Sequence, residues 1–175
     1  MGAAIPVWYR TKILMSPESD SCVMQDYTGL ELSPRKVEYL KYLSGQGGSA
    51  KISELSGHFG VDPSTATRTV QELTWEGFIH HEPYGNVVLT GSGEEYSAFL
   101  LRRHRILGLI LSHYGLSNQE ACEEASRIEC FISRSAVNKM CRSLGHPTAG
   151  LCGEITHDAL CRPEGTVANC HEKVS

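Results

Sequence analysis

Residues 50–90 read AKISELSGHFGVDPSTATRTVQELTWEGFIHHEPYGNVVLT, and this stretch decides the fold. Apolar side chains at helical spacing over 52–59 predict a short amphipathic helix, and Gly60 marks the turn that ends it. Asp62-Pro63 then supplies an N-cap and a proline at the first position of a second helix. Two short helices joined by a tight turn are typical of a helix-turn-helix.

A β-hairpin is expected directly after the second helix. Segments 78–81 and 87–90 carry strand-forming side chains and flank turn-forming residues at 82–86. A helix-turn-helix pattern alone is often an ordinary helical corner, but three helices followed by a hairpin within 33–90 form a more specific pattern. The sequence therefore predicts a winged helix-turn-helix domain with a two-stranded β wing.

The exposed face of the second helix is rich in hydroxyl groups and carries one arginine. Ser64, Thr65, Thr67 and Arg68 lie in its first turns, where side chains of a recognition helix hydrogen-bond to phosphates and base edges. Tyr84, at the tip of the hairpin, is a further candidate contact. We therefore expect these five residues to bind double-stranded DNA.

The overall charge neither requires nor excludes a nucleic-acid partner. The chain has a formal net charge of −4, and residues 33–105 contain eight basic and eight acidic side chains. Specific regulators can be neutral when a few basic and hydroxyl groups face the phosphates. A hydrophobic content of 41% and a charged content of 21% are ordinary for a globular protein and argue against wholesale disorder.

Helical patterns continue on both sides of the quoted stretch. Helices are expected over 34–44, from 91 to 115, over 118–132 and from 133 or 135 to 144. We therefore expect a mainly α protein, in which a winged-helix domain over 33–90 is followed by a linking helix and a helical dimerisation domain over 91–147.

Two terminal segments, 1–32 and 148–175, lack sustained periodicity. We expect the first to be a flexible leader and the second a tail that contains cysteine and histidine. Because the helical domain carries more apolar residues than one small domain needs, we expect a homodimer with Phe99, Leu100 and Ile110 at or near its interface.

Several protein classes are disfavoured. No apolar run reaches the roughly 20 residues of a membrane span, and the first residues lack the apolar stretch of a signal peptide. The seven cysteines are therefore interpreted as thiols of a cytoplasmic protein. The motifs HExxH, GxSxG and the P-loop are absent from the sequence, so we do not expect an enzyme.

A candidate metal site lies in the second half of the chain. Cys122, Ser126 and Glu129 can share one helix face, and His104 adds an imidazole. A set with sulfur, nitrogen and oxygen donors suits Fe²⁺, Co²⁺, Ni²⁺ or Zn²⁺ better than Mg²⁺ or Ca²⁺. The alternatives are that Cys122 and Cys130 are buried packing residues, that Glu129 forms a salt bridge, and that His104 faces a dimer partner or phosphates.

Local strings between residues 33 and 147 resemble the diphtheria toxin repressor family, including its manganese transport regulator branch. The strings are ISEL at 52–55, VDPSTAT at 61–67, LTGSG at 89–93, RHR at 103–105 and EASRIE at 124–129. The last two are the most specific, because winged helices are common whereas a histidine and acidic cluster on these helices is not. The resemblance implies a metal-activated regulator, acting as a repressor of metal-homeostasis genes, whose dimer binds a palindromic operator.

In that family a metal joins the first helix of the winged domain to the dimerisation domain. The resemblance implies Glu38 as the ligand from the first helix, His104 from the linking helix, and Glu129 and Cys130 from a following helix where family members have Glu-His. Cys122 matches a position that holds an ancillary-site histidine in some members. Fe²⁺ is the first choice of metal, with Mn²⁺, Co²⁺, Ni²⁺ or Zn²⁺ as alternatives.

Three residues depart from the family pattern. Arg35 replaces an Asp or Met ligand, Gly108 replaces an ancillary-site glutamate, and Ser126 replaces a Cys or Glu ligand. These departures leave both the identity of the metal and the number of sites open.

Thiols and a histidine near the carboxyl end form a second candidate group. Cys141, His146, Cys152 and Cys161 could hold a second metal or form a thiol-redox site, although no CxxC pair occurs among them. A cysteine-based redox-sensing winged-helix regulator is therefore the alternative to a metal-responsive one.

Overall fold

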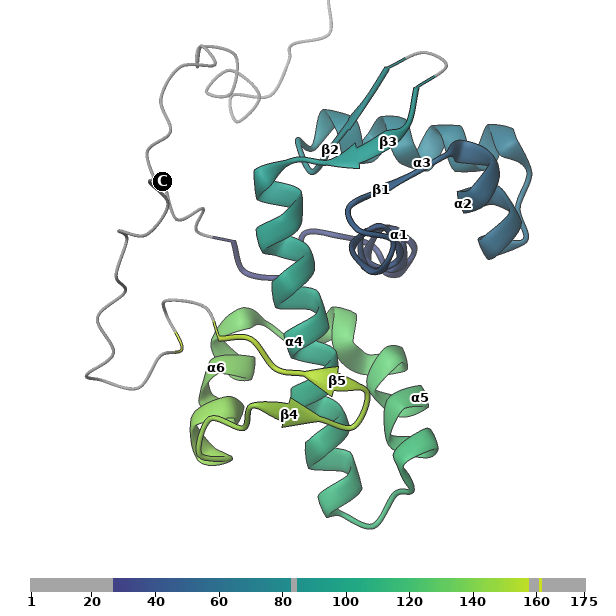
Figure 1. The fold of residues 1–175 in the computed structure, drawn as a ribbon. Helices are drawn as coiled ribbons and strands as arrows, with labels where there is room; N and C mark the ends of the chain where they lie inside the picture. Colours follow the sequence, from purple (N-terminus) through teal and green to yellow (C-terminus); the bar gives the residue numbers. More distant parts are fainter. Residues whose placement is uncertain (1–26, 83–84, 158–160, 162–175) are drawn as a thin grey trace, which may run out of the picture.

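The structure is a computed structural model that describes residues 27–82, 85–157 and 161 (Figure 1). The first part is a winged-helix domain, and its elements are α1 (Pro34–Gly45), β1 (Ser49–Ala50), α2 (Ile52–Phe59), α3 (Pro63–Trp75), β2 (Ile79–His81) and β3 (Val87–Leu89). The second part is helical, with α4 (Gly91–His113), α5 (Asn118–Ile128), the 3₁₀ helix η2 (Glu129–Phe131), α6 (Arg134–Ser143), β4 (Ala149–Gly150) and β5 (Gly153–Glu154). The predicted mainly α fold with a winged helix-turn-helix domain is confirmed.

The wing is part of a three-stranded antiparallel sheet with the order β1-β3-β2. His80 pairs with Val88 between the two expected strands, and Ala50 pairs with Val87 on the other side of β3. The strand β1 was not predicted because two residues between glycines and a helix start carry no periodic signal. It joins the wing to the start of α2.

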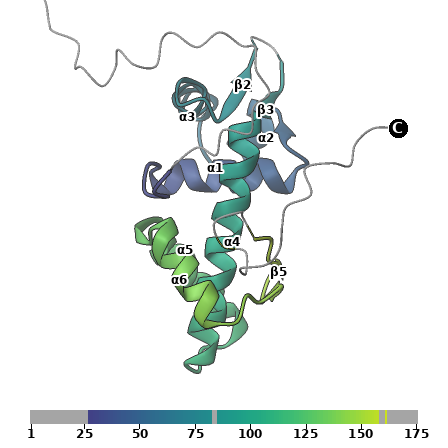
Figure 2. The same ribbon diagram turned by 90° about the vertical axis from the view of Figure 1, so that its left-hand side faces the viewer.

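Helix α4 is the element that both domains share. It runs from the wing into the helical domain, and α1 lies across its upper half (Figures 1 and 2). Thr90 caps it by accepting a hydrogen bond from the Gly93 amide at 3.1 Å. In its middle, Arg102, Arg103 and His104 are all buried, so a stretch that contains three consecutive basic side chains lies inside the molecule. No helix among the described residues is long and apolar enough to cross a membrane.

The described end of the expected leader, residues 27–32, is packed onto α4 rather than free. The Tyr96 hydroxyl donates to Glu31 Oε2 at 2.7 Å, and Arg103 Nη1 donates to the Gly29 carbonyl at 2.6 Å. Tyr27 places its ring centroid 4.7 Å from that of Tyr96. Residues 27–32 therefore belong to the folded part of the protein, and residues 1–26 lie outside the described part of the chain.

Two of the residues expected at the dimer interface, Phe99 and Leu100, are buried inside a single chain. Phe99 and Leu100 are 3% and 0% exposed, because both belong to the hydrophobic core of the chain, where the Tyr27 ring packs against Phe99. They are core residues, so this part of the interface prediction is wrong. The described part of the helical domain instead exposes Tyr114 and Phe131 and, to a lesser degree, Ile128 and Leu144.

A matched pair of glycines in the first turn of α4 tests this packing. A methyl group at Gly93 would lie 1.9 Å from the Phe78 carbonyl oxygen, whereas Gly91 has no neighbouring atom within 4 Å. We expect Gly93→Ala to lower the free energy of unfolding by about 3 kcal/mol or more, because the backbone of the wing must move. Gly91→Ala is the control and should unfold in urea like the wild type. Equal midpoints for the two variants would contradict this close approach.

Candidate DNA interface and metal centre

The amino-terminal turns of α3 present the predicted DNA contacts. Ser64 and Arg68 are exposed, whereas Thr65 and Thr67 are half-buried. The Arg68 side chain is 83% exposed, and its Nε lies 3.3 Å from Glu72 Oε1, a loose pairing that phosphate or a base edge can replace. The Thr67 hydroxyl donates to the Pro63 carbonyl at 2.7 Å, so toward DNA it can act only as an acceptor.

A hollow of about 360 Å³ lies between α2, α3 and the wing. Lys51 and Ser53 contribute to its wall from the start of α2, and Thr67 and Asn86 contribute from α3 and the wing. Lys51 and Ser53 were not among the DNA contacts predicted from the sequence, and lysine and serine side chains are of the kind that contact phosphates. Tyr84 lies outside the described residues.

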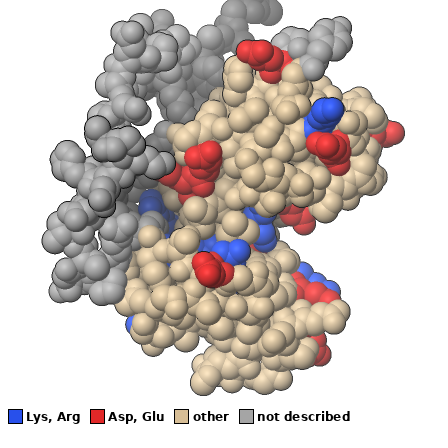
Figure 3. Space-filling model, viewed as in Figure 1, with Lys and Arg blue, Asp and Glu red and all other residues tan. Residues whose placement is uncertain are grey.

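Charge is scattered over the face of the molecule drawn in Figure 3. Lysine and arginine side chains alternate with acidic ones, and no continuous basic patch covers this face. Lys36 is occupied by two carboxylates, since its ammonium group lies 3.1 Å from Glu72 and 2.8 Å from Glu76. The face drawn in Figure 3 therefore offers DNA no broad basic surface.

The two domains meet at the carboxylate of Glu129, which is 2% exposed and lies on η2. Lys41 of α1 donates from Nζ to Glu129 Oε1 at 2.8 Å, and His104 Nδ1 of α4 lies 3.1 Å from Oε2. Burial alone would raise the pKa of Glu129, but the hydrogen bonds from His104 and Lys41 and the charge of Lys41 hold this pKa below its usual value. The side chain is therefore an ionised carboxylate that connects three elements.

His104 also belongs to a group of possible metal ligands. One ring nitrogen of His104 and the sulfur atoms of Cys122 and Cys152 all lie within 4.8 Å of one another. Because Nδ1 is engaged by Glu129, Nε2 is the nitrogen left for a metal. Cys122 comes from α5 and Cys152 from the turn between β4 and β5. Burial and the neighbouring Cys152 raise the pKa of Cys122, as expected for two thiols that share a site without an ion.

The remaining ligands implied by the family resemblance are arranged differently. Glu38 is exposed on α1, and Cys130 is buried on η2, where burial raises the pKa of its thiol. Two groups among the described residues bring at least three ligand atoms within 4.8 Å of one another. Neither group contains Glu38, Glu129 or Cys130. A metal between Glu38 and Glu129 would also have to displace the ammonium group of Lys41. The donor set around His104, Cys122 and Cys152 fits a divalent metal without that rearrangement.

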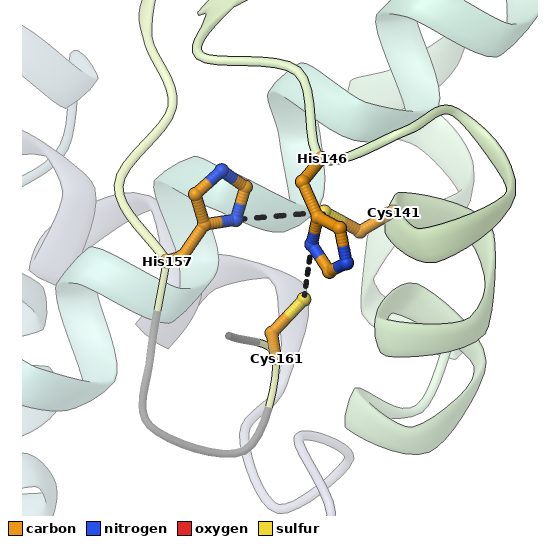
Figure 4. A group of neighbouring side chains, drawn as sticks. All are labelled: Cys141, His146, His157 and Cys161. Atoms are coloured by element: carbon orange, nitrogen blue, oxygen red, sulfur yellow. Dashed lines mark hydrogen bonds between the residues drawn. The ribbon is translucent and has the colours of Figure 1, made fainter. Parts of the chain in front are cut away.

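Part of the second predicted thiol group does come together. Cys141, His146 and Cys161 lie near one another, but the fourth member is His157 (Figure 4). Cys152, which we expected here, lies with His104 and Cys122 instead, because the β4–β5 turn points it toward α4 and α5. The spacing Cys-x₄-His-x₁₀-His-x₃-Cys was the available signal for His157, and the search for a CxxC pair missed it.

The fold and these two groups define a winged-helix DNA-binding protein with a helical domain suited to metal binding. Residues 31–87 match the family model described as iron dependent repressor, N-terminal DNA binding domain. Residues 90–155 match the model described as iron dependent repressor, metal binding and dimerisation domain. The chain belongs to this family. Its members are DNA-binding, metal-dependent transcriptional regulators and not enzymes, as the sequence predicted.

Individual relatives agree with this assignment. The chain is 27% identical over 104 residues to the HTH-type transcriptional regulator MntR of Lysinibacillus sphaericus, covering 59% of this chain and 75% of the relative. It superimposes on the hypothetical protein SSo2273 of Sulfolobus solfataricus with a TM-score of 0.60 and 25% identity, covering 71% of this chain and 96% of that one. The ScaR structure with bound Zn²⁺ gives a TM-score of 0.58 and 27% identity, with 66% and 56% covered. None of these similarities supports the redox-sensing alternative.

Alanine substitutions on α3 test the recognition helix. Arg68→Ala should weaken binding to operator DNA by about 1–3 kcal/mol if the guanidinium contacts a base edge, and Thr65→Ala should weaken it less. Fluorescence anisotropy with labelled DNA measures both. Arg127→Ala removes an exposed arginine of α5 and serves as the control, with unchanged affinity expected. If Arg68→Ala and Thr65→Ala bind like the wild type, the DNA surface lies elsewhere.

Proposed function

We propose that the chain is a metal-activated repressor that controls metal-homeostasis genes and binds a palindromic operator as a homodimer. The observation that supports this proposal most directly is the double role of His104. Its Nδ1 contacts Glu129, which holds α1 of the winged domain through Lys41, and one of its ring nitrogens belongs to the ligand group with Cys122 and Cys152. Any ion bound to His104 in that group would be linked to α1 through Glu129 and Lys41.

We propose His104, Cys122 and Cys152 as the protein ligands of the regulatory metal. When bound, the metal supplies a dication that holds α4, α5 and the β4–β5 turn together. Glu129 orients the imidazole by accepting its Nδ1 proton, which is the usual outer partner of a ligating histidine. Lys41 connects Glu129 to α1, because its ammonium group forms one of the contacts between the two domains.

The donor chemistry narrows the choice of metal. Two thiols and an imidazole favour Fe²⁺, Co²⁺, Ni²⁺ or Zn²⁺ over Mn²⁺, which prefers carboxylate and water ligands. We propose Fe²⁺ as the physiological ion, in line with the family description. Among the similar structures, ScaR holds Zn²⁺ in one case, and a manganese-dependent repressor holds manganese in another.

The regulatory metal has a second possible position, at the ligands that the family resemblance implies. Glu38, Glu129 and Cys130 become available to an ion only if Lys41 leaves Glu129, since the ammonium group already neutralises that carboxylate. The two placements share His104 but differ in their other ligands. Substitution can therefore separate them.

The distance between the two recognition helices of a dimer determines the spacing of the operator half-sites. A homodimer with twofold symmetry presents two α3 helices, which suit half-sites separated by one helical turn of DNA, about 34–36 Å. The metal group lies in the helical domain and is linked to α1 through Glu129 and Lys41, so a bound metal would affect how each α3 is held relative to the dimer. We propose that metal binding selects the spacing that fits the operator.

The decisive experiment compares the metal dependence of operator binding in four variants. Palindromic DNA selected by the wild type from a random pool is titrated by anisotropy with Fe²⁺ or Co²⁺, without oxygen, or with chelator. We expect Cys122→Ser and Cys152→Ser to abolish the metal response, while Glu38→Gln and Cys130→Ser retain it. Glu123→Gln, an exposed change on α5, is the control and should respond like the wild type.

The opposite pattern would place the metal at Glu38 and Cys130. A full response in all four variants would overturn both placements. No metal response in the wild type would contradict the proposed function itself.

Removing the ammonium group of Lys41 tests whether its ion pair with Glu129 holds the two domains together. Lys41→Met leaves the Glu129 carboxylate buried with one partner, which should lower the free energy of unfolding by about 3 kcal/mol. Urea denaturation measures the loss, and Lys139→Met on α6 is the control. Unchanged stability in Lys41→Met would mean that the ion pair does not hold the domains together.

A further inference from the structure

Four side chains of the second ligand group are held in a closed arrangement near the carboxyl end of the described chain. They are Cys141 at the end of α6, His146 in the turn after it, and His157 and Cys161 in the segment that follows β5 (Figure 4). We propose that these four residues bind a structural Zn²⁺ ion that fastens the segment after β5 to α6. This site is separate from the group around His104.

The distances between the donor atoms match a tetrahedral zinc centre. Cys141 Sγ lies 3.5 Å from His157 Nδ1 and 3.9 Å from His146 Nδ1, and Cys161 Sγ lies 3.8 Å from His146 Nδ1. Zinc bonds of 2.3 Å to sulfur and 2.0–2.1 Å to nitrogen predict sulfur-to-nitrogen distances of about 3.6 Å across a tetrahedron. All four donors lie within 4.8 Å of one another, so one ion can contact them all.

Burial and charge favour a metal over a set of neutral groups. Cys141 and Cys161 are 0% and 1% exposed, and both histidines are half-buried. Two thiolates balance the charge of one dication, and neutral imidazoles complete the coordination, so the loaded site carries no net charge in the interior. The group contains no carboxylate, which disfavours Mg²⁺, Ca²⁺ and Mn²⁺.

The backbone before the second ligand adopts a conformation that favours this arrangement. His146 has a φ of 57°, in the left-handed region that non-glycine residues rarely adopt, and Gly145 before it has a φ of 73°. The His146 amide donates to the Cys141 carbonyl at 3.0 Å, which closes the turn after α6. The turn places the His146 ring beside Cys161, and coordination offsets the cost of the left-handed residue.

The proposed zinc also determines where the β4–β5 hairpin lies. The hairpin occupies residues 149–154, between His146 and His157, so both of its ends are fixed by ligands of one ion. Its turn carries Cys152 to His104 and Cys122. The zinc site therefore acts as a positioning element for Cys152, a consequence that rests on the proposed function, whereas the zinc site itself does not.

Metal analysis of the purified full chain tests the site. We expect about one equivalent of Zn²⁺ per chain to survive dialysis against a weak chelator under reducing conditions. His157→Asn and Cys161→Ser should each lose that ion, whereas Cys122→Ser and Cys152→Ser, which alter the other group, should retain it. Replacement of zinc by Co²⁺ should give the intense visible absorption of a tetrahedral thiolate site, and this absorption should be absent in His157→Asn.

Titration of the wild type with a mercurial thiol reagent keeps the test valid if a variant misfolds, because it should release the zinc as the thiols react. A folded, reduced wild type without zinc would overturn the site, as would a Cys141–Cys161 disulfide that persists under the reducing conditions of the purification, or zinc retained in both His157→Asn and Cys161→Ser. Loss of the zinc in Cys122→Ser and Cys152→Ser would assign it to the other group. Retained zinc without a metal response of DNA binding would refute the proposed function and leave this site intact.

Discussion

The placement of the two domains depends on one buried carboxylate. Glu129 cannot remain ionised in the interior without partners, because a lone buried charge costs several kcal/mol. Its partners, Lys41 and His104, come from α1 and α4, so satisfying one charge brings the winged domain and the helical domain into contact. The family resemblance implies that Glu129 is a metal ligand. In this chain the ammonium group of Lys41 already pairs with that carboxylate, and this pairing distinguishes the chain from the ligand set of the family.

The two ligand groups on the helical domain suit different tasks. The group around His104 includes an exposed Cys152 and a half-buried Cys122, so an ion there can exchange with solution, as a sensor requires. The sulfur atoms of Cys141 and Cys161 are buried, and four protein donors leave no open position, which is the character of a structural site. The hairpin between them connects the two, because it is fixed by one group and donates Cys152 to the other.

The local structure could be predicted from the sequence, whereas the contacts between distant elements could not. Helix starts at Pro34, Pro63 and Asn118 follow from proline and capping-box signals within a few residues, and all three are observed. The expected helix through residue 132 ends instead at Ile128, since η2 turns Glu129 toward Lys41, which lies 88 residues away in the sequence. His157 was missed for a similar reason, because only folding of the segment after β5 onto α6 brings it to Cys141.

Crystallography of the metal-loaded full chain tests the central claim most directly. Crystals grown with Co²⁺ or Fe²⁺ would be measured at the absorption edge of the metal, so that anomalous difference maps locate each ion without assumptions about its ligands. We predict a peak within bonding distance of His104 Nε2, Cys122 Sγ and Cys152 Sγ, with Lys41 still bound to Glu129. A peak bound by Glu38 and Glu129 with Lys41 displaced, or no peak near His104, would contradict it.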